Sequence, residues 1–508
     1  MSTQTIWERA AEAEGTTQSE QYLTRLGRKA FLSLWSYSNP YSDEGRINGK
    51  GDGKELCDLL IVFGNNVLLF SDKHCEFPSH ADIQVAWSRW YKNAIDKSAR
   101  QLSGAEKFLR VYPNRIFLDK QCQHPLPIEI PSPESAKYFL IAVTRGSYEA
   151  GEKYWGGGSS GSLMLDSSLE GKQQHTKPFV VGHPIGRNRF VHVLDELTLD
   201  ALLGELDTVP DLVSYLECKE KYFSKQGLTV TAAGEEQLLA RYICTLIKGE
   251  HGLPEVPKGT DYVGFVEGDW EYYSQSQERK AKIAADSISY MWDSLIEYQS
   301  GFIRAGTALS LLPERDEPTN HELVVRALAD ESRLSRRQLA THLRYALSQS
   351  QPGHKFSRVV LSPRRPERAY VFLTIPKPEE VTYDDYRSLR SEILLTYCRA
   401  IKIKVPNLIE AVGIASEPLT ESMASQDFLY VNLQEPVDRE EEEALKELME
   451  ELDILQSATL TAVKGKAVEF PVPFRPHKPS FIPPEAFGMN RAARRALAKQ
   501  DRRKKPRK

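Results

Sequence analysis

Asp58 and Lys73 are the side chains of this sequence whose types and spacing point most directly to chemistry. Asp58 lies within a short apolar segment, residues 56–63, and Lys73 lies just beyond a second one, residues 67–70. The two segments are rich in Val, Ile, Leu and Phe, and Gly-Asn-Asn at 64–66 separates them. This pattern predicts a β-hairpin that carries an acid on one strand and an amine on the other.

The register of this hairpin decides which polar groups meet. A two-residue turn at 65–66 would place Asp58 directly opposite Lys73, with Cβ atoms about 5 Å apart. Period-two alternation puts Ser71 on the same face and Asp72 on the opposite face. A register that differs by one residue would instead place Asp72 opposite Asp58.

The predicted pair buries two opposite charges, which is unfavourable unless the charges are paired or serve a ligand. One interpretation is that Asp58 binds a divalent cation, which polarises a phosphate and generates hydroxide. Lys73 would then position that nucleophile or offset negative charge in the transition state. The other interpretation is an ordinary cross-strand salt bridge at the rim of the sheet. Spacing alone leaves both open.

The hairpin resembles the PD-(D/E)XK (restriction-endonuclease-like) nuclease superfamily, across roughly residues 16–145. In that superfamily an acidic residue opens the second strand of the core and a (D/E)-x-K triplet ends the third. Asp58 and Lys73 match these two positions. Glu20 stands in the preceding helix, where many members carry an additional glutamate, and Gln101 resembles a glutamine of the following helix. The match covers under a third of the chain, and its motifs are short.

The resemblance implies a metal-dependent nuclease that hydrolyses phosphodiester bonds, with Mg²⁺ or Mn²⁺ as cofactor and DNA rather than RNA as the expected substrate. It implies that Asp58 and Glu20 bind the metal and that Lys73 assists the attacking water. Members with large additional domains often serve in bacterial restriction or anti-phage defence. That role is expected here from the resemblance only.

Ser71 departs from the family pattern, because it stands where the triplet normally has its acidic residue. Its hydroxyl could contribute to the site directly or hold a water. Glu55, Asp72 and Glu76 are candidates to supply the missing carboxylate. Glu55 and Asp72, together with Gln101, form the supporting residues. Since one metal-binding carboxylate is lost, the alternative is a catalytically inactive, nuclease-like binding or scaffold protein.

The elements around the hairpin predict an α/β core. Residues 16–35 and 82–111 have apolar side chains at helical spacing, whereas 115–118, 138–144 and 190–194 are typical of strands. The resemblance implies that these elements form a central mixed sheet flanked by helices, as in a restriction-endonuclease-like fold.

The sequence pattern divides the chain into four regions. Residues 1–230 are expected to form the nuclease-like domain, 231–350 a helical region, 351–470 an α+β domain of unknown role, and 471–508 a Pro-rich linker with a basic tail. The sequence has no secretory signal and no apolar run of membrane-spanning length. We therefore expect a cytoplasmic protein with no membrane partner.

The tail is strongly basic, although the whole chain has a net charge of −4. Residues 491–508 hold ten Lys or Arg residues and one Asp. This asymmetry indicates a polyanionic partner. The tail side chains expected to contact nucleic acid are Arg494, Arg495, Arg502 and Arg503.

Two further motifs leave alternatives open. Residues 157–161 satisfy the G-x-S-x-G pattern of a hydrolase elbow, but a polar segment precedes them, so a turn-forming loop is favoured. A hydrolase that uses Ser159 is therefore the third functional alternative. Arg364 and Arg365 lie in a basic loop between two predicted strands, and the loop is either a solvated turn or a phosphate contact.

Overall fold

The structure, a computed structural model, describes residues 5–12, 14–46, 50–156, 160–247, 249–308, 318–349, 353–418, 425–456 and 468–472. The chain divides into two compact units, residues 1–280 with 472–508 (unit 1) and residues 281–471 (unit 2). Both units combine helices with mixed sheets, which confirms the coarse α/β class expected from the sequence. None of the described helices is long and apolar enough to cross a lipid bilayer.

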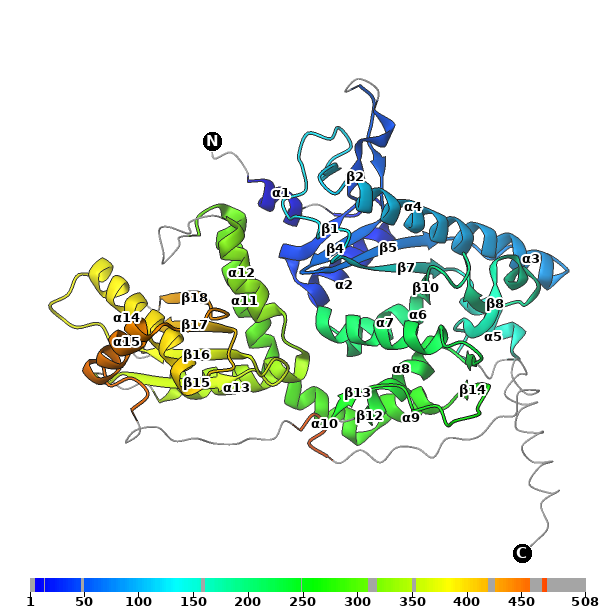
Figure 1. Ribbon diagram of the computed structural model, residues 1–508. Coiled ribbons are helices and arrows are strands. Elements are labelled where there is room, and N and C mark those ends of the chain that lie inside the picture. Colours follow the sequence, from blue (N-terminus) through cyan, green and yellow to red (C-terminus); the bar gives the residue numbers. More distant parts are fainter. Residues whose placement is uncertain are drawn as a thin grey trace, which may run out of the picture. The chain divides into compact units, whose positions relative to one another are not determined.

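A five-stranded mixed sheet carries the predicted hairpin in unit 1 (Figure 1). Its order is β1-β4-β5-β7-β10; β1, β4 and β5 are antiparallel, whereas β5, β7 and β10 are parallel. Every residue of β4 is buried, as expected for a strand covered on both faces. The strands are β1 (Ser36–Ser38), β4 (Leu59–Phe63), β5 (Asn66–His74), β7 (Lys137–Arg145) and β10 (His192–Asp195).

Helix α2 (Gln18–Phe31) packs on one face of this sheet. Its apolar side chains recur at helical spacing, and Phe31 meets Phe70 with ring centroids 6.3 Å apart. Gly27 allows the helix to approach closely, because a Cβ there would lie 2.6 Å from a methyl carbon of Leu59. The face that α2 covers is therefore the one that carries Leu59 and Phe70.

The opposite face is covered by α3 (Ile83–Tyr91) and α4 (Lys97–Val111), which share a core with Leu60 and Leu69. A π-helical turn, Lys92–Asp96, joins the two helices. Such a turn inserts one extra residue and so rotates everything that follows it around the helix axis. The predicted helix over 82–111 is thus present, with a register change near its middle.

A second sheet of unit 1 is not predicted by the sequence. Its order is β14-β11-β8-β9. The expectation of a helical region at 231–350 is wrong in its first part, which holds β12, β13 and β14. Strands of two to four residues carry too few alternating positions to be recognised by periodicity. The strands are β8 (Met164–Glu170), β9 (Val180–His183), β11 (Thr229–Ala232), β12 (Leu246–Ile247), β13 (Glu250–His251) and β14 (Tyr262–Phe265).

The remaining elements of unit 1 are shorter helices and a small sheet in the order β3-β2-β6. They are α1 (Ile6–Glu12), α5 (Tyr148–Tyr154), α6 (Glu196–Glu205), α7 (Val209–Phe223), α8 (Glu235–Cys244), α9 (Asp269–Gln275), β2 (Tyr41–Ser42), β3 (Lys54–Glu55), β6 (Ile116–Phe117) and the 3-10 helix η4 (Gly171–Thr176).

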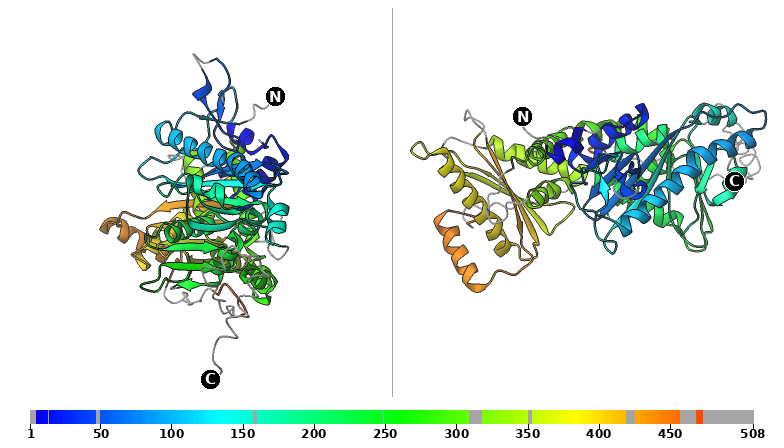
Figure 2. Two further views of the ribbon diagram at one scale, coloured as in Figure 1. Left: turned by 90° about the vertical axis from the view of Figure 1, so that its right-hand side faces the viewer. Right: turned by 90° about the horizontal axis from the view of Figure 1, so that it is seen from above.

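Unit 2 contains a four-stranded sheet in the order β15-β16-β17-β18, with β16 and β17 parallel and the outer pairs antiparallel. The yellow α14 and orange α15 lie on one side of this sheet (Figure 2). Strands and helices both occur in this unit, in agreement with the α+β domain expected at 351–470. The elements are α10 (Gln277–Asp286, across the boundary), α11 (Ser289–Ala305), α12 (Pro318–Ala329), α13 (Arg333–Ser348), β15 (Phe356–Leu361), β16 (Arg368–Thr374), α14 (Tyr383–Lys404), β17 (Glu410–Ser416), β18 (Gln426–Asn432) and α15 (Arg439–Glu451).

Candidate active site

The β4–β5 hairpin forms with a register that differs from the expected one. Leu59 pairs with Phe70, which makes 64–65 the two-residue turn instead of 65–66. Gly64 has a φ of 55°, a conformation that glycine adopts without steric penalty. A tight hairpin turn with glycine in its first central position matches the twist of the flanking strands. Glycine, and not the asparagine pair, therefore sets the turn.

The shift is two residues, so it moves pairs along the strand without moving any side chain to the other face. Extending the register by one residue brings Asp58 level with Ser71. The prediction that Asp58 lies directly opposite Lys73 is therefore wrong. By strand alternation Asp58, Ser71 and Lys73 still share the face that α4 covers.

Asp58 is 2% exposed and immediately precedes β4. Its own N–H donates to the Phe70 carbonyl oxygen at 2.9 Å, and its Oδ2 accepts the N–H of Asp72. Burial raises the pKa of Asp58 to about 7; the charge of Lys73 opposes this rise, and hydrogen bonding to the Glu55 side chain adds to it. The Asp58 carboxyl is thus poised to hold either a proton or a cation near neutral pH.

Lys73 lies at the end of β5 and is partly exposed. It forms no ion pair with any other residue that the structure describes. Its charge still acts on Asp58, since it lowers the pKa of that carboxyl. The cross-strand salt bridge that the sequence left open is therefore not formed, and the ammonium keeps its three donors for another partner.

Asn39, which the sequence did not predict as a site residue, contacts the acidic side chains near Asp58. It follows β1 with a φ of 44°, and its Nδ2 donates to Glu20 Oε2 at 3.3 Å and to Glu55 Oε1 at 3.2 Å. Asn39 is 6% exposed, and its Oδ1 has no hydrogen-bond partner among the described residues. A buried amide oxygen without a partner is unfavourable unless a ligand completes it. The sequence signal was weak: an asparagine before proline, which usually marks only a turn.

Glu20 is primarily a helix-capping residue. Its Oε2 accepts the backbone N–H groups of Thr16 and Thr17 at 2.8 and 3.2 Å, completing a capping box at the start of α2. Burial would raise the pKa of Glu20, but these hydrogen bonds outweigh burial and lower it. Glu20 reaches the Asp58 cluster through Asn39 and Glu55. Its expected role as a metal ligand stays a prediction.

The supporting residues divide between the two faces of β5. Ser71 is fully buried, and its hydroxyl donates to Ser98 Oγ of α4 at 3.3 Å. Asp72 points to the other face, as expected, where Arg145 holds it with two nitrogens at 2.9 to 3.2 Å. Gln101 lies one turn beyond Ser98 on α4. Asp72 is therefore neutralised by an arginine and does not replace the carboxylate missing at Ser71.

The atoms at the hairpin end that could bind a metal ion are oxygens. They belong to the carboxyls of Asp58 and Glu55 and to the side-chain amide of Asn39, whose Oδ1 has no partner among the described residues. Mg²⁺ and Mn²⁺ prefer such ligands and take several waters besides. Within the described residues no three Asp, Glu, His or Cys side chains converge on one point. The residues present thus fit a cation held by two carboxylates and an amide, and they do not form a three-carboxylate site.

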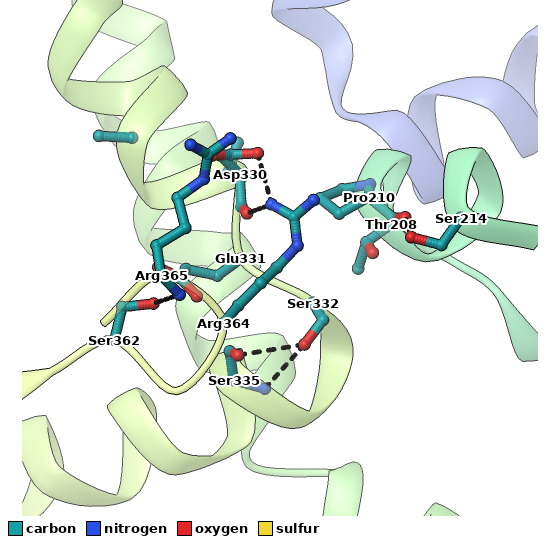
Figure 3. Close-up of polar contacts among 12 residues, drawn as sticks. Thr208, Pro210, Ser214, Asp330, Glu331, Ser332, Ser335, Ser362, Arg364 and Arg365 are labelled. Atoms are coloured by element: carbon teal, nitrogen blue, oxygen red, sulfur yellow. Dashed lines mark hydrogen bonds and ion pairs between the residues drawn. The ribbon is translucent and has the colours of Figure 1, made fainter. Parts of the chain in front are cut away.

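Arg364 and Arg365, in the turn between β15 and β16, are anchored within unit 2 (Figure 3). Arg364 Nη1 donates to Asp330 Oδ1 at 2.7 Å, and Arg365 Nε lies 2.5 Å from Asp330 Oδ2. Ser362 Oγ accepts the N–H of Arg365 at 2.9 Å. The turn is therefore held by ion pairs, and a phosphate contact there stays a prediction.

Several predicted residues lie outside the described part of the chain. They are Ser159 and the tail residues Arg494, Arg495, Arg502 and Arg503.

In comparisons with known proteins, no protein-family model, no curated protein and no solved structure matches the chain.

Proposed function

We propose that unit 1 is a divalent-metal-dependent nuclease whose site is the end of the β4–β5 hairpin. The observation that carries the proposal is a buried Asp58 carboxyl that shares a sheet face with an unpaired Lys73 ammonium. An ordinary fold would pair these charges or replace them by apolar residues. A site that binds a cation and a phosphate requires both charges to be available.

The connectivity of unit 1 supports this proposal. The chain runs from α2 through the antiparallel strands β1, β4 and β5, then through α3 and α4 to the parallel strand β7. That order resembles the core of the PD-(D/E)XK superfamily. Asp58 directly precedes the second of these strands and Lys73 is near the end of the third, in agreement with the superfamily pattern. DNA is the expected substrate, and a role in bacterial restriction or anti-phage defence is part of the proposal.

Each residue has a distinct task in the proposed reaction. Asp58 and Glu55 would hold Mg²⁺ or Mn²⁺ together with Asn39 Oδ1, and the bound ion would supply Lewis acidity. Lys73 would orient the attacking water and stabilise negative charge on the phosphate. Glu20 would keep Asn39 in place from the start of α2. Ser71 would fix α4 against the site through Ser98.

The test is cleavage of plasmid and single-stranded DNA by the full chain with Mg²⁺ or Mn²⁺, and with EDTA in place of the metal. We expect Asp58→Ala and Lys73→Ala each to lower cutting by at least about 100-fold, the usual effect of removing a group that stabilises the transition state. Lys137→Ala is the matched control, because this β7 lysine is exposed and paired with Glu217. Cutting that survives in Asp58→Ala or Lys73→Ala would exclude the mechanism.

A second candidate is a nuclease-like protein that binds nucleic acid without cutting it. The observation that favours it is Ser71, which stands where the superfamily pattern has an acidic residue. Its hydroxyl donates a hydrogen bond to Ser98. In that case wild type would bind DNA and cut neither substrate with either metal. Truncation after Asn490 would separately test the basic tail, since its loss should weaken binding and flatten the salt dependence.

A further inference from the structure

A serine, a histidine and an aspartate meet on unit 1 in a cluster separate from the residues at the hairpin end. Ser88 Oγ lies 3.0 Å from Nδ1 of His175, and Nε2 of His175 lies 3.2 Å from Asp96 Oδ2. The histidine therefore connects a hydroxyl on one side with a carboxylate on the other. Ser88 comes from α3, Asp96 from the π-helical turn and His175 from η4.

The π-helical turn is what aligns Ser88 with Asp96. Residues eight apart in a regular α-helix are separated by about 80° around the axis. The extra residue of the π turn takes up roughly one residue of rotation, which reduces this angle to about 20°. The two side chains thus point along one stripe of the helix. π turns are rare and are found frequently at functional sites.

His175 is held firmly between them. The indole Nε1 of Trp87 donates to the carbonyl oxygen of Gln174 at 2.7 Å, which fixes η4 against α3. The ring of Tyr91 meets the imidazole edge-on with centroids 4.9 Å apart. The side chains of His175 and Asp96 are 19% and 13% exposed, so solvent reaches a cluster that is otherwise packed.

We propose that Ser88, His175 and Asp96 form a nucleophilic triad that reacts with activated esters. With the Nε2 proton donated to Asp96, Nδ1 is free to accept the proton of the Ser88 hydroxyl. Such constellations recur on unrelated folds and are recognised by geometry and roles rather than by chain order. An acyl-transfer site requires a hydrogen bond between nucleophile and base, and a second one that orients the base. The Ser88–His175 and His175–Asp96 contacts supply these two.

The reaction balances without any other co-reactant than water. Ser88 Oγ bonds to the ester carbonyl carbon, the bond to the leaving oxygen breaks, and His175 transfers the hydroxyl proton to that oxygen. Water, deprotonated by His175, then releases the acid and restores the hydroxyl. Activated esters suit this site, because their leaving groups depart with little further stabilisation.

A fluorophosphonate probe tests the proposal on the full-length protein. The Ser88 oxygen would displace fluoride from phosphorus, leaving an adduct that peptide mass spectrometry places on Ser88. We expect Ser88→Ala to remove the adduct and His175→Gln to slow its formation by about 100-fold, the scale of general-base catalysis. Asp96→Asn should slow it as well. Ser391→Ala is the control, because this helical serine donates to the Arg387 carbonyl oxygen instead of to a histidine.

Two outcomes would overturn the triad. One is a folded wild-type protein with no adduct on Ser88. The other is an adduct that forms equally fast in His175→Gln, which would make Ser88 merely accessible. Melting temperatures of the variants separate these results from unfolding. The nuclease proposal is unaffected by either outcome, since DNA cutting is measured with Asp58→Ala and Lys73→Ala.

Discussion

Two buried charge clusters, one in each unit, are balanced in different ways. In unit 2, Arg390 is fully buried and donates from Nε to Asp427 Oδ2 at 2.6 Å, with Glu417 at 3.7 Å. In unit 1, Asp58 is nearly as inaccessible, at 2% exposed, but no described residue forms an ion pair with it. Lys73 lies on the same face and acts on it only from a distance.

The difference distinguishes a charge that stabilises the fold, at Arg390, from one that does not, at Asp58. A complete buried ion pair is strongly disturbed by loss of one partner, because the other charge is left without compensation. An unpaired buried carboxyl instead takes up a proton, and the pKa of Asp58 is accordingly raised to about 7. A group that lowers stability at neutral pH is a better candidate for binding or catalysis than for folding.

The largest expected effect concerns the paired cluster. Arg390→Ala should lower the free energy of unfolding of unit 2 by about 3–5 kcal/mol, because Asp427 would keep only the partly exposed Arg387 as a partner and the buried Glu417 would lose its arginine. Urea denaturation of the full chain, followed by far-ultraviolet circular dichroism, measures this change. Arg439→Ala is the control: its side chain is 92% exposed, and its loss should change stability by under about 0.5 kcal/mol. Equal effects of the two substitutions would contradict the comparison.

Asp58→Asn should instead raise the free energy of unfolding at neutral and alkaline pH. The folded-state pKa of Asp58 lies above its unfolded value of 3.8, so wild type loses stability as pH rises from about 4 through 7. The amide carries no charge, and the variant should be more stable than wild type by about 1–3 kcal/mol at pH 8. The same variant should no longer cut DNA.

The pH dependence provides the control for Asp58→Asn. Below the unfolded pKa of 3.8 the carboxyl is protonated in both states, so the advantage of the variant should disappear there. Thermal melts of both proteins at pH 3 and pH 8 measure this. A variant that is less stable than wild type at pH 8 would show that Asp58 is a structural residue like Asp427.

A smaller effect, on the metal requirement, is expected at Asn39. It tests whether the Oδ1 atom without a described partner binds the metal ion. Asn39→Ala removes Oδ1 and should raise the Mg²⁺ concentration needed for half-maximal cutting by about 10-fold. Ser38→Ala is a neighbouring control, since the Ser38 hydroxyl is hydrogen-bonded to Thr24 Oγ1 of α2 at 2.9 Å. A metal requirement unchanged in Asn39→Ala would remove the amide from the proposed ligand set.

The smallest effect is expected at Glu20. Glu20→Gln keeps side-chain oxygen for the N–H groups of Thr16 and Thr17, so stability should change by only a few tenths of a kcal/mol. Cutting should fall by less than about threefold if Glu20 acts through Asn39, a difference under about 0.7 kcal/mol. Steady-state cleavage rates measure this. A loss comparable to that in Asp58→Ala would instead make Glu20 a direct metal ligand.

The sequence predicted the face of the hairpin better than its register. Period-two alternation placed Asp58, Ser71 and Lys73 together, and a shift of two residues left that grouping intact. The turn was wrong because Gly64 competes with the asparagines for the positive φ. The opposite orientation of Asp72 also followed from alternation, although its partner Arg145 is 73 residues away and could not be inferred.

Local patterns alone determined the apolar hairpin and the helices on either side of it, because each depends on spacing within one segment. Tertiary structure decided which distant groups meet: Asn39 with Glu55, Arg145 with Asp72, and His175 with Ser88 and Asp96. These contacts join separate elements, so their geometry depends on helix packing, on one π turn and on the strand register. Helix packing, the π turn and the strand register cannot be inferred from the residues that neighbour each side chain in the sequence.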